Sequence, residues 1–99
     1  MPAPVATTTT PASIAALLTA EAQAAGVAPS LVKAVAWQES GWRMVIAADG
    51  GIGIMQLMPD TVTWVETSLL KQTIDPYNAT DNVRTGVALL RYYLGTFGD

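Results

Sequence analysis

Apolar residues near the C-terminal end recur at helical spacing, and no other feature constrains the fold of this chain as strongly. They stand four, three, four and three residues apart: Val83, Val87, Leu90, Leu94 and Phe97. This spacing places them on one face of an α-helix that starts at Thr80 or Asp81. Such a helix is stable in water only when its apolar face packs against other elements, so the rest of the chain must supply partners.

The N-terminal part divides into a tail and a first helix. Residues 1–12 carry three prolines and four threonines without apolar periodicity, which indicates a flexible tail or linker. A helix follows over residues 13–25, with Ser13 as its N-cap and Gly26 as its stop. Since 99 residues suffice for one domain and not for two, residues 13–99 are expected to form a single domain.

Two more helices are predicted in the middle of the chain. One begins at Pro29 and ends near Glu39 or Ser40, and the other starts near Asp60. A short helical piece is expected at residues 54–58. The helix that starts near Asp60 carries three apolar residues on one side: Val62, Val65 and Leu69. No segment alternates with a period of two, so the fold class is mostly α: a single compact helical domain with a Gly-rich loop.

The composition excludes several classes of function. Without Cys or His, the chain has no disulfide, no zinc site of the usual ligands and no Ser-His or Cys-His nucleophile. The five Lys and Arg are dispersed and the net charge is -3, so nucleic acid is not an expected partner. No apolar run reaches the ~18 residues of a membrane span, and the N-terminus lacks the pattern of a signal peptide. A monomer is expected.

Glu39 is the carboxylate with the most unusual predicted surroundings. It lies on the helical face of Val32, Val35 and Ala36, at the C-terminal end of its helix. Apolar neighbours and the negative end of the helix dipole both disfavour a charged carboxylate. Glu39 is thus a candidate proton donor, and a solvated glutamate at a helix end is the alternative that the spacing leaves open.

Motifs around Glu39 resemble a known family. The run Glu39-Ser40-Gly41-Trp42 is followed by GGIGIMQLMP at residues 50–59, and Asn82 is followed by Gly86 and the pair Leu89-Leu90. These segments are similar to the motifs of soluble lytic transglycosylase domains, the goose-lysozyme-like branch of the lysozyme superfamily. The resemblance covers residues 13 to 97.

The resemblance implies a lysozyme-like fold and a peptidoglycan lytic transglycosylase. Its substrate would be the β-1,4 bond between N-acetylmuramic acid and N-acetylglucosamine, with peptidoglycan glycan strands as the partner and no cofactor or metal. Glu39 matches the family's catalytic acid, which then acts as base and leaves a 1,6-anhydromuramoyl product. The expected location is extracytoplasmic, with an export signal outside this chain.

Four further residues near the glutamate have expected roles. The resemblance places Met55 and Gln56 along the sugar groove, although Met55 could equally belong to the core. Ser40 is expected either to cap its helix or to contact substrate. Trp42 is expected to pack under the loop. The other aromatic residues near the helix ends are assigned to helix packing rather than to sugar contact: Trp64, Tyr77, Tyr92 and Tyr93.

The sequence departs from the family in two places. Ala47 and Ala48 occupy the region where the family commonly has a serine, and the chain stops at Asp99 before the family's Ala-Tyr-Asn-x-Gly segment. The C-terminal segment of the family is therefore expected to be missing. Two alternatives remain open: a muramidase-type hydrolase that uses Glu39 with Asp49, and a catalytically weak peptidoglycan-binding module.

Overall fold

The computed structural model describes residues 10–98, so most of the expected tail lies outside the described residues. The first helix, α1, spans Pro11–Ala25 and begins two residues earlier than the sequence predicted. Its N-cap is Thr10 rather than Ser13, because the Thr10 hydroxyl accepts a hydrogen bond from the Ser13 backbone N–H at 3.1 Å. Helix α1 ends at Gly26, as predicted.

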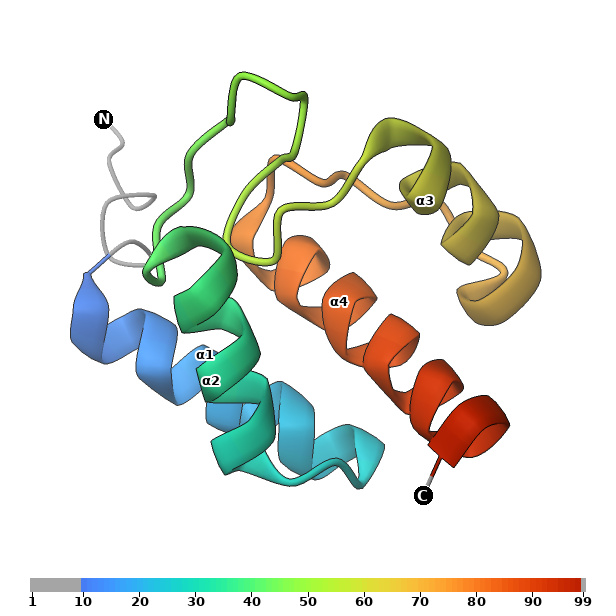
Figure 1. Ribbon diagram of the computed structural model, residues 1–99, viewed down its shortest axis with the longest axis horizontal. Coiled ribbons are helices and arrows are strands. Elements are labelled where there is room, and N and C mark those ends of the chain that lie inside the picture. Colours follow the sequence, from blue (N-terminus) through green and yellow to red (C-terminus); the bar gives the residue numbers. More distant parts are fainter. Residues whose placement is uncertain (1–9, 99) are drawn as a thin grey trace.

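Helix α2, Pro29–Ser40, packs against α1 and confirms the predicted second helix (Figure 1). The two helices contribute buried side chains to one core. Leu18 and Ala22 of α1 are fully buried, as are Val32 and Ala36 of α2. The apolar stripe predicted for α2 is therefore confirmed as far as Ala36.

The segment from residue 41 to residue 58 is an irregular loop, and the glycines had predicted its first part, residues 41–53. The helical piece expected at residues 54–58 is wrong. Two isolated antiparallel bridges join Ile46 to Ile52 and Ile52 to Leu57. Gln56 has φ of 51°, a left-handed value that ends any right-handed helix at this point.

The predicted third helix occurs as two joined pieces. Helix α3, Pro59–Trp64, continues directly into η2, Val65–Leu70, which is a π-helix. Val62 and Val65 are buried as the spacing predicted, and Leu69 is half-buried.

Helix α4, Ala79–Tyr93, runs diagonally across the molecule and continues into a second π-helix, η3, Leu94–Gly98 (Figure 1). Its N-cap is Asn78, whose side chain accepts a hydrogen bond from the Asp81 N–H at 3.0 Å. Helix α4 packs on α1 and on η2. Its first half lies in the core, where Val83 and Val87 are buried.

The second half of α4 corrects the sequence prediction. Leu90 is only half-buried, and Leu94, just beyond the helix, is 42% exposed. The side chain of Phe97 lies outside the described residues. No described element covers this end of the apolar stripe, so the stripe leaves the core and borders open space.

The observed architecture confirms the mostly α fold class. All named elements of residues 10–98 are helices around one apolar core, and none of these helices is both long and apolar enough to cross a membrane. The core draws on every helix from α1 to α4 and on the loop, through Ile54 and Leu57.

Candidate active site

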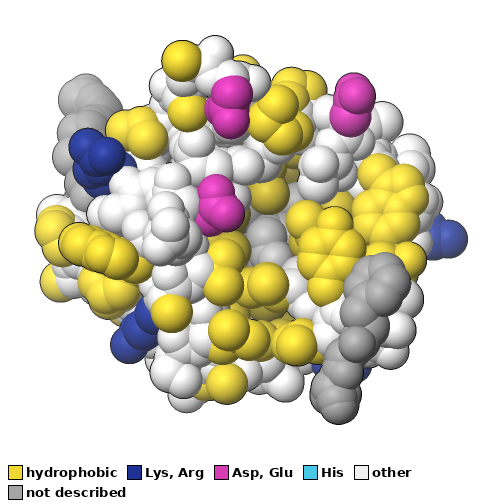
Figure 2. Space-filling view, in the orientation of Figure 1, with side chains coloured by type: hydrophobic (Ala, Val, Ile, Leu, Met, Phe, Trp, Pro, Cys, Tyr) yellow, Lys and Arg dark blue, Asp and Glu magenta, His cyan; other side chains and the backbone are white. Residues whose placement is uncertain are grey.

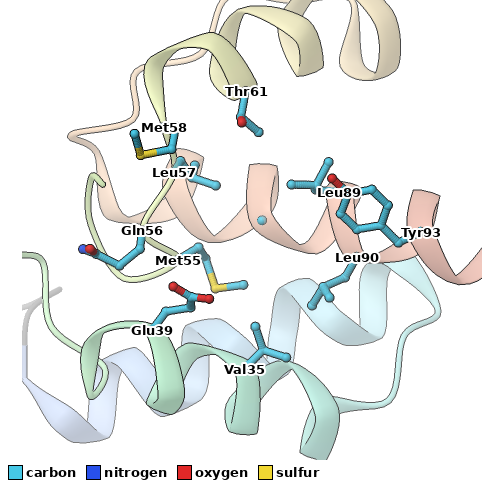
Figure 3. A pocket seen from close by; sticks show the side chains of 11 residues that line it. Val35, Glu39, Met55, Gln56, Leu57, Met58, Thr61, Leu89, Leu90 and Tyr93 are labelled. Atoms are coloured by element: carbon cyan, nitrogen blue, oxygen red, sulfur yellow. The ribbon is translucent and has the colours of Figure 1, made fainter. Parts of the chain in front are cut away.

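A pocket of about 220 Å³ opens between the end of α2, the loop and the second half of α4. Figure 2 shows this face of the molecule, with hydrophobic side chains gathered around a hollow. Figure 3 shows the side chains that line the pocket. The lining comes from four segments of the chain: Val35, Glu39, Met55, Gln56, Leu57, Met58, Thr61, Gly86, Leu89, Leu90 and Tyr93.

Glu39 is the one acidic residue in this lining. It lies in the last turn of α2, and its carboxylate points from the helix toward Met55 (Figure 3). Among the described residues the one ion pair joins Arg84 to Glu21, so no cation pairs with Glu39. The apolar neighbours that its helical face predicts do not bury Glu39, which is exposed and lines the pocket.

Ser40 lies beside Glu39 in sequence and points the other way, into the protein. It is 6% exposed, and its hydroxyl donates to the Ile54 carbonyl oxygen at 2.7 Å. The Ser40 hydroxyl oxygen in turn accepts a hydrogen bond from the Arg43 N–H at 3.1 Å. Ser40 does not line the pocket. The Ser40 hydroxyl therefore joins the end of α2 to the loop.

Asn82 fastens the other side of the loop. It is fully buried in α4, where its Oδ1 accepts from the Met55 N–H at 2.8 Å. Its Nδ2 donates to the carbonyl oxygens of Ile52 at 2.9 Å and Pro76 at 2.8 Å. Asparagine supplies one acceptor and two donors, and all are used here. Asn78 caps helix α4, and Asn82, in its first turn, ties the helix to the loop.

Met55 reaches the pocket because α4 has no side chain at Gly86. A Cβ atom added there would lie 2.5 Å from Cγ of Met55. The close neighbour of α4 at Gly86 is therefore the loop. Met55 is 6% exposed and belongs to both the core and the pocket lining.

Gln56 forms part of the pocket edge in a strained backbone conformation. A non-glycine residue at positive φ costs about 1–2 kcal/mol, which the surroundings must offset. Its Nε2 donates to the carbonyl oxygens of Val45 at 3.0 Å and Gly53 at 2.9 Å. These bonds hold the turn closed and occupy both amide hydrogens, and Oε1 lies toward Gly51, where an added Cβ atom would be 2.7 Å from it.

Asp49 does not join the pocket. It is exposed, and its Oδ1 accepts a hydrogen bond from the Gly51 N–H at 3.0 Å. This contact spans two residues and closes an Asx turn, which is the ordinary use of an aspartate before glycines. Across residues 10–98 no three acidic side chains gather closely enough to hold a metal ion.

Several lining residues were not among the candidate site residues. Leu89, Leu90 and Tyr93 form the α4 wall, and Thr61 comes from the first turns of α3. Figure 3 shows Leu89 and Tyr93 across the pocket from Glu39. The available signals were the apolar stripe for Leu90 and the Leu89-Leu90 pair of the motif for Leu89, whereas Tyr93 was assigned to helix packing.

A helical fold with one carboxylate at the edge of an apolar groove belongs to the lysozyme-like class, and the comparisons with known proteins agree. The chain belongs to the transglycosylase SLT domain family, whose model matches residues 16–99. No curated protein sequence matches it.

Two solved structures resemble the chain in fold and sequence. An inactive Glu-to-Gln mutant of the lytic transglycosylase Slt from Pseudomonas aeruginosa has a TM-score of 0.73 and 26% identity, over 88% of this chain. The 70 kDa soluble lytic transglycosylase from Escherichia coli has a TM-score of 0.71 and 29% identity, over 83%. The chain spans only 15% and 14% of the length of these two proteins.

Proposed function

We propose that this domain is a peptidoglycan lytic transglycosylase with Glu39 as its catalytic acid and base. The observation that supports the proposal most is the single carboxylate at the pocket, in a chain whose family includes lytic transglycosylases. One of the similar structures is a Glu-to-Gln mutant described as inactive, which fits a reaction that depends on one glutamate.

In the proposed reaction Glu39 acts twice on a glycan strand in the pocket. It first gives a proton to the oxygen of the β-1,4 bond between N-acetylmuramic acid and N-acetylglucosamine, and the bond breaks. The carboxylate then takes the proton from the muramoyl C6 hydroxyl, which bonds to C1 of the same sugar. The product is a 1,6-anhydromuramoyl end, and no water is consumed.

A single carboxylate suffices for this reaction because the nucleophile belongs to the substrate. An intramolecular hydroxyl in good alignment has an effective molarity far above that of a second molecule. Hydrolysis would instead need a second carboxylate to serve as nucleophile or to activate water. Asp49, the expected partner for that chemistry, lies in a turn outside the pocket lining. The geometry therefore favours the transglycosylase over the hydrolase.

The loop and α4 would hold the substrate in the proposed complex. Met55 would offer an apolar surface, and Gln56 would form the edge of the groove through the turn that its amide holds closed. Ser40 acts through its bond to Ile54 rather than by touching sugar. Since peptidoglycan lies outside the cytoplasm, the proposed place of action is extracytoplasmic.

One observation favours a second function, a peptidoglycan-binding module with little or no catalysis. Glu39 is exposed, whereas a proton donor near neutral pH benefits from removal of water around it. Such a module would keep the groove and bind a glycan strand without cleaving it.

Mass spectrometry of digested sacculi separates these functions. The chain is expected to release muropeptides whose muramoyl ends are lighter by one water than hydrolysed ends. Glu39→Gln should abolish this product, since positioned acid–base catalysis contributes about 10²- to 10⁴-fold in rate. Asp49→Asn is the matched control and should change the rate little. Reducing ends with a severe Asp49→Asn defect would establish the hydrolase, and binding to sacculi without cleavage would establish the binding module.

A further inference from the structure

The outer face of α2 carries the most exposed tryptophan of the chain. Trp37 is 63% exposed, whereas Trp64 is 39% exposed and Trp42 is half-buried. The Trp37 ring does not belong to the apolar core, and it does not line the Glu39 pocket. Neither the fold nor the proposed function therefore accounts for a large apolar ring at this position.

Trp42 supports the Trp37 ring from one side. The two ring centroids lie 5.6 Å apart with their planes at 87°, an edge contact that fixes the orientation of both rings. Trp42 is itself held to α2, because its N–H donates to the Lys33 carbonyl oxygen at 3.0 Å. The Trp37 N–H has no hydrogen-bond partner within residues 10–98. This donor is therefore able to bond to a group outside the protein.

Two cations accompany the tryptophan pair. Lys33 precedes Trp37 by one helical turn, so the two share a face of α2. Arg43 directly follows Trp42, and its Nε donates to the Ser40 carbonyl oxygen at 2.9 Å, at the end of the helix. The one ion pair in the described part of the chain joins α1 to α4, so no carboxylate neutralises either cation. At the left edge of Figure 2, hydrophobic side chains lie beside two basic side chains.

Four residues thus form one surface, which we call the α2 patch: Lys33, Trp37, Trp42 and Arg43. Its composition fits the surface of a lipid bilayer. Tryptophan is enriched at the level of the headgroups, where its ring is apolar and its N–H meets polar acceptors. Lys and Arg at the same level are attracted by anionic headgroups. The chain as a whole has a net charge of -3, so this attraction has to be local.

Other occupants fit the α2 patch less well. A second copy of the chain on a twofold axis would bring the same patch of both copies together, so Lys33 and Arg43 would face like charges. A soluble polyanion would use the two cations and leave the exposed indole without a role. A bilayer with anionic lipids uses both the cations and the ring.

The α2 patch and the Glu39 pocket face in different directions. Trp37 and Glu39 are two residues apart in α2, which places them about 200° apart around the helix axis. Contact through the patch therefore leaves the pocket open. We propose that the α2 patch docks this domain on a bilayer that contains anionic phospholipid, with the Trp37 ring at the level of the headgroups.

Sedimentation of the unaltered chain with vesicles tests the proposal. The chain should bind vesicles of phosphatidylcholine mixed with phosphatidylglycerol, and bind vesicles of phosphatidylcholine alone more weakly. High salt should weaken binding to the mixed vesicles, since it screens exposed charges. A soluble short-chain phosphatidylglycerol locates the contact by NMR. It should shift the indole N–H signal of Trp37 and leave that of Trp64 in place.

Four substitutions separate the patch from the rest of the surface. Trp37→Ala should weaken binding to the mixed vesicles about tenfold, because it removes the apolar contact. Lys33→Gln should weaken it about threefold to fivefold, as expected for one cation at an anionic surface. Trp64→Ala and Lys71→Gln are the matched controls from elsewhere on the surface, and both should bind as the unaltered chain does.

Several outcomes would overturn the proposal. They are no sedimentation with the mixed vesicles, equal losses for Trp37→Ala and Trp64→Ala, and a Trp37 signal that the short-chain lipid does not shift. Binding of polyphosphate without binding of vesicles would establish a polyanion site instead. A dimer in analytical ultracentrifugation that Trp37→Ala dissociates, in a chain that does not bind vesicles, would establish a second copy as the occupant.

Discussion

The two walls of the groove are built in different ways. The loop wall, residues 41–58, is fixed by two buried polar side chains, Ser40 and Asn82. The opposite wall, formed by α3 and the second half of α4, consists of aliphatic and aromatic side chains that are partly exposed. The loop wall holds backbone atoms at defined positions next to Glu39. The helical wall offers aliphatic and aromatic surface. It constrains the position of a ligand atom less than the loop wall does.

The two walls would have different roles in the proposed reaction, and these roles fit the difference in how the walls are built. Proton transfer requires heavy atoms within about 3 Å of each other, so the residues around Glu39 must be held accurately. Contact with the rest of the substrate requires only that apolar surface be covered. An irregular loop next to the acid is thus the more rigidly held of the two walls, and the regular helices are the more permissive.

Gly53→Ala should have the largest effect on stability, because it breaks the loop wall at its tightest point. Gly53 has φ of 76°, and a Cβ atom there would collide with the Asn82 side-chain amide. Left-handed strain and displaced hydrogen bonds together should lower the free energy of unfolding by about 4 kcal/mol. Urea unfolding measures this loss. Gly95→Ala, where a Cβ meets nothing within 4 Å, is the matched change and should be nearly neutral.

Asn82→Leu should have the second largest effect on the free energy of unfolding. It keeps a side chain of similar size and removes all three hydrogen bonds, which leaves the Met55 N–H and two carbonyls unpaired. Each buried unpaired group costs about 1–3 kcal/mol, and partial relaxation brings the expected total to about 3 kcal/mol. Hydrogen exchange should show faster exchange at the Met55 amide. An unchanged Met55 amide would mean that the loop is held by other contacts.

Ser40→Ala should lower the free energy of unfolding by about 1–2 kcal/mol, since the hydroxyl bonds inside the protein are lost. The same variant distinguishes the two expected roles of Ser40. Loosening of the loop should slow cleavage while chitobiose affinity stays the same, whereas a direct sugar contact would weaken chitobiose binding. Titration of the short sugar and the cleavage rate, measured on one preparation, decide between them.

Arg84→Gln should have the smallest effect, because its ion pair with Glu21 lies at the surface away from both walls. The Arg84 Nε lies 3.1 Å from the Glu21 Oε1, and Glu21 raises the pKa of Arg84 through this hydrogen bond and through its charge. Exposed pairs contribute about 0.2–1 kcal/mol.

A raised pKa for a cation means stability that is present below its ordinary pKa and is lost only as the pH rises through the raised value. For arginine both values lie in strongly alkaline solution. The difference in Tm between Arg84→Gln and the unaltered chain should therefore stay constant over about pH 6 to 9. A difference that changes within this range would show that another group depends on Arg84.

The sequence predicted the helices well and the ends of their apolar faces poorly. Periodicity found α1, α2 and α4 because each carries a repeated apolar stripe, and a repeat is a local property. The helix expected at residues 54–58 failed because IMQLM has good helix formers, while the backbone there is turned by contacts with residues far away in sequence. The composition of residues 54–58 does not predict their hydrogen bonds with Asn82 and Val45.

In the candidate site, too, local patterns were predicted correctly and features that depend on distant contacts were not. Glu39, Met55 and Gln56 were identified through motifs, and all three line the pocket. Ser40 was named with them and lies inside the protein, since neighbouring residues on a helix point in different directions. The burial expected for Glu39 did not occur, because an apolar stripe on one helix does not specify whether another element covers its last turn.

The sequence by itself determined the helical class, the choice of Glu39 as the candidate residue and the Gly-rich loop, because helix periodicity, glycine content and short motifs depend on neighbours within a few residues. Only the tertiary structure decided which polar groups hold the loop, that Glu39 is open to water, and that Trp64 meets Tyr92 across two helices. These features arise from contacts between residues distant in sequence, whose geometry exists only after the helices have packed.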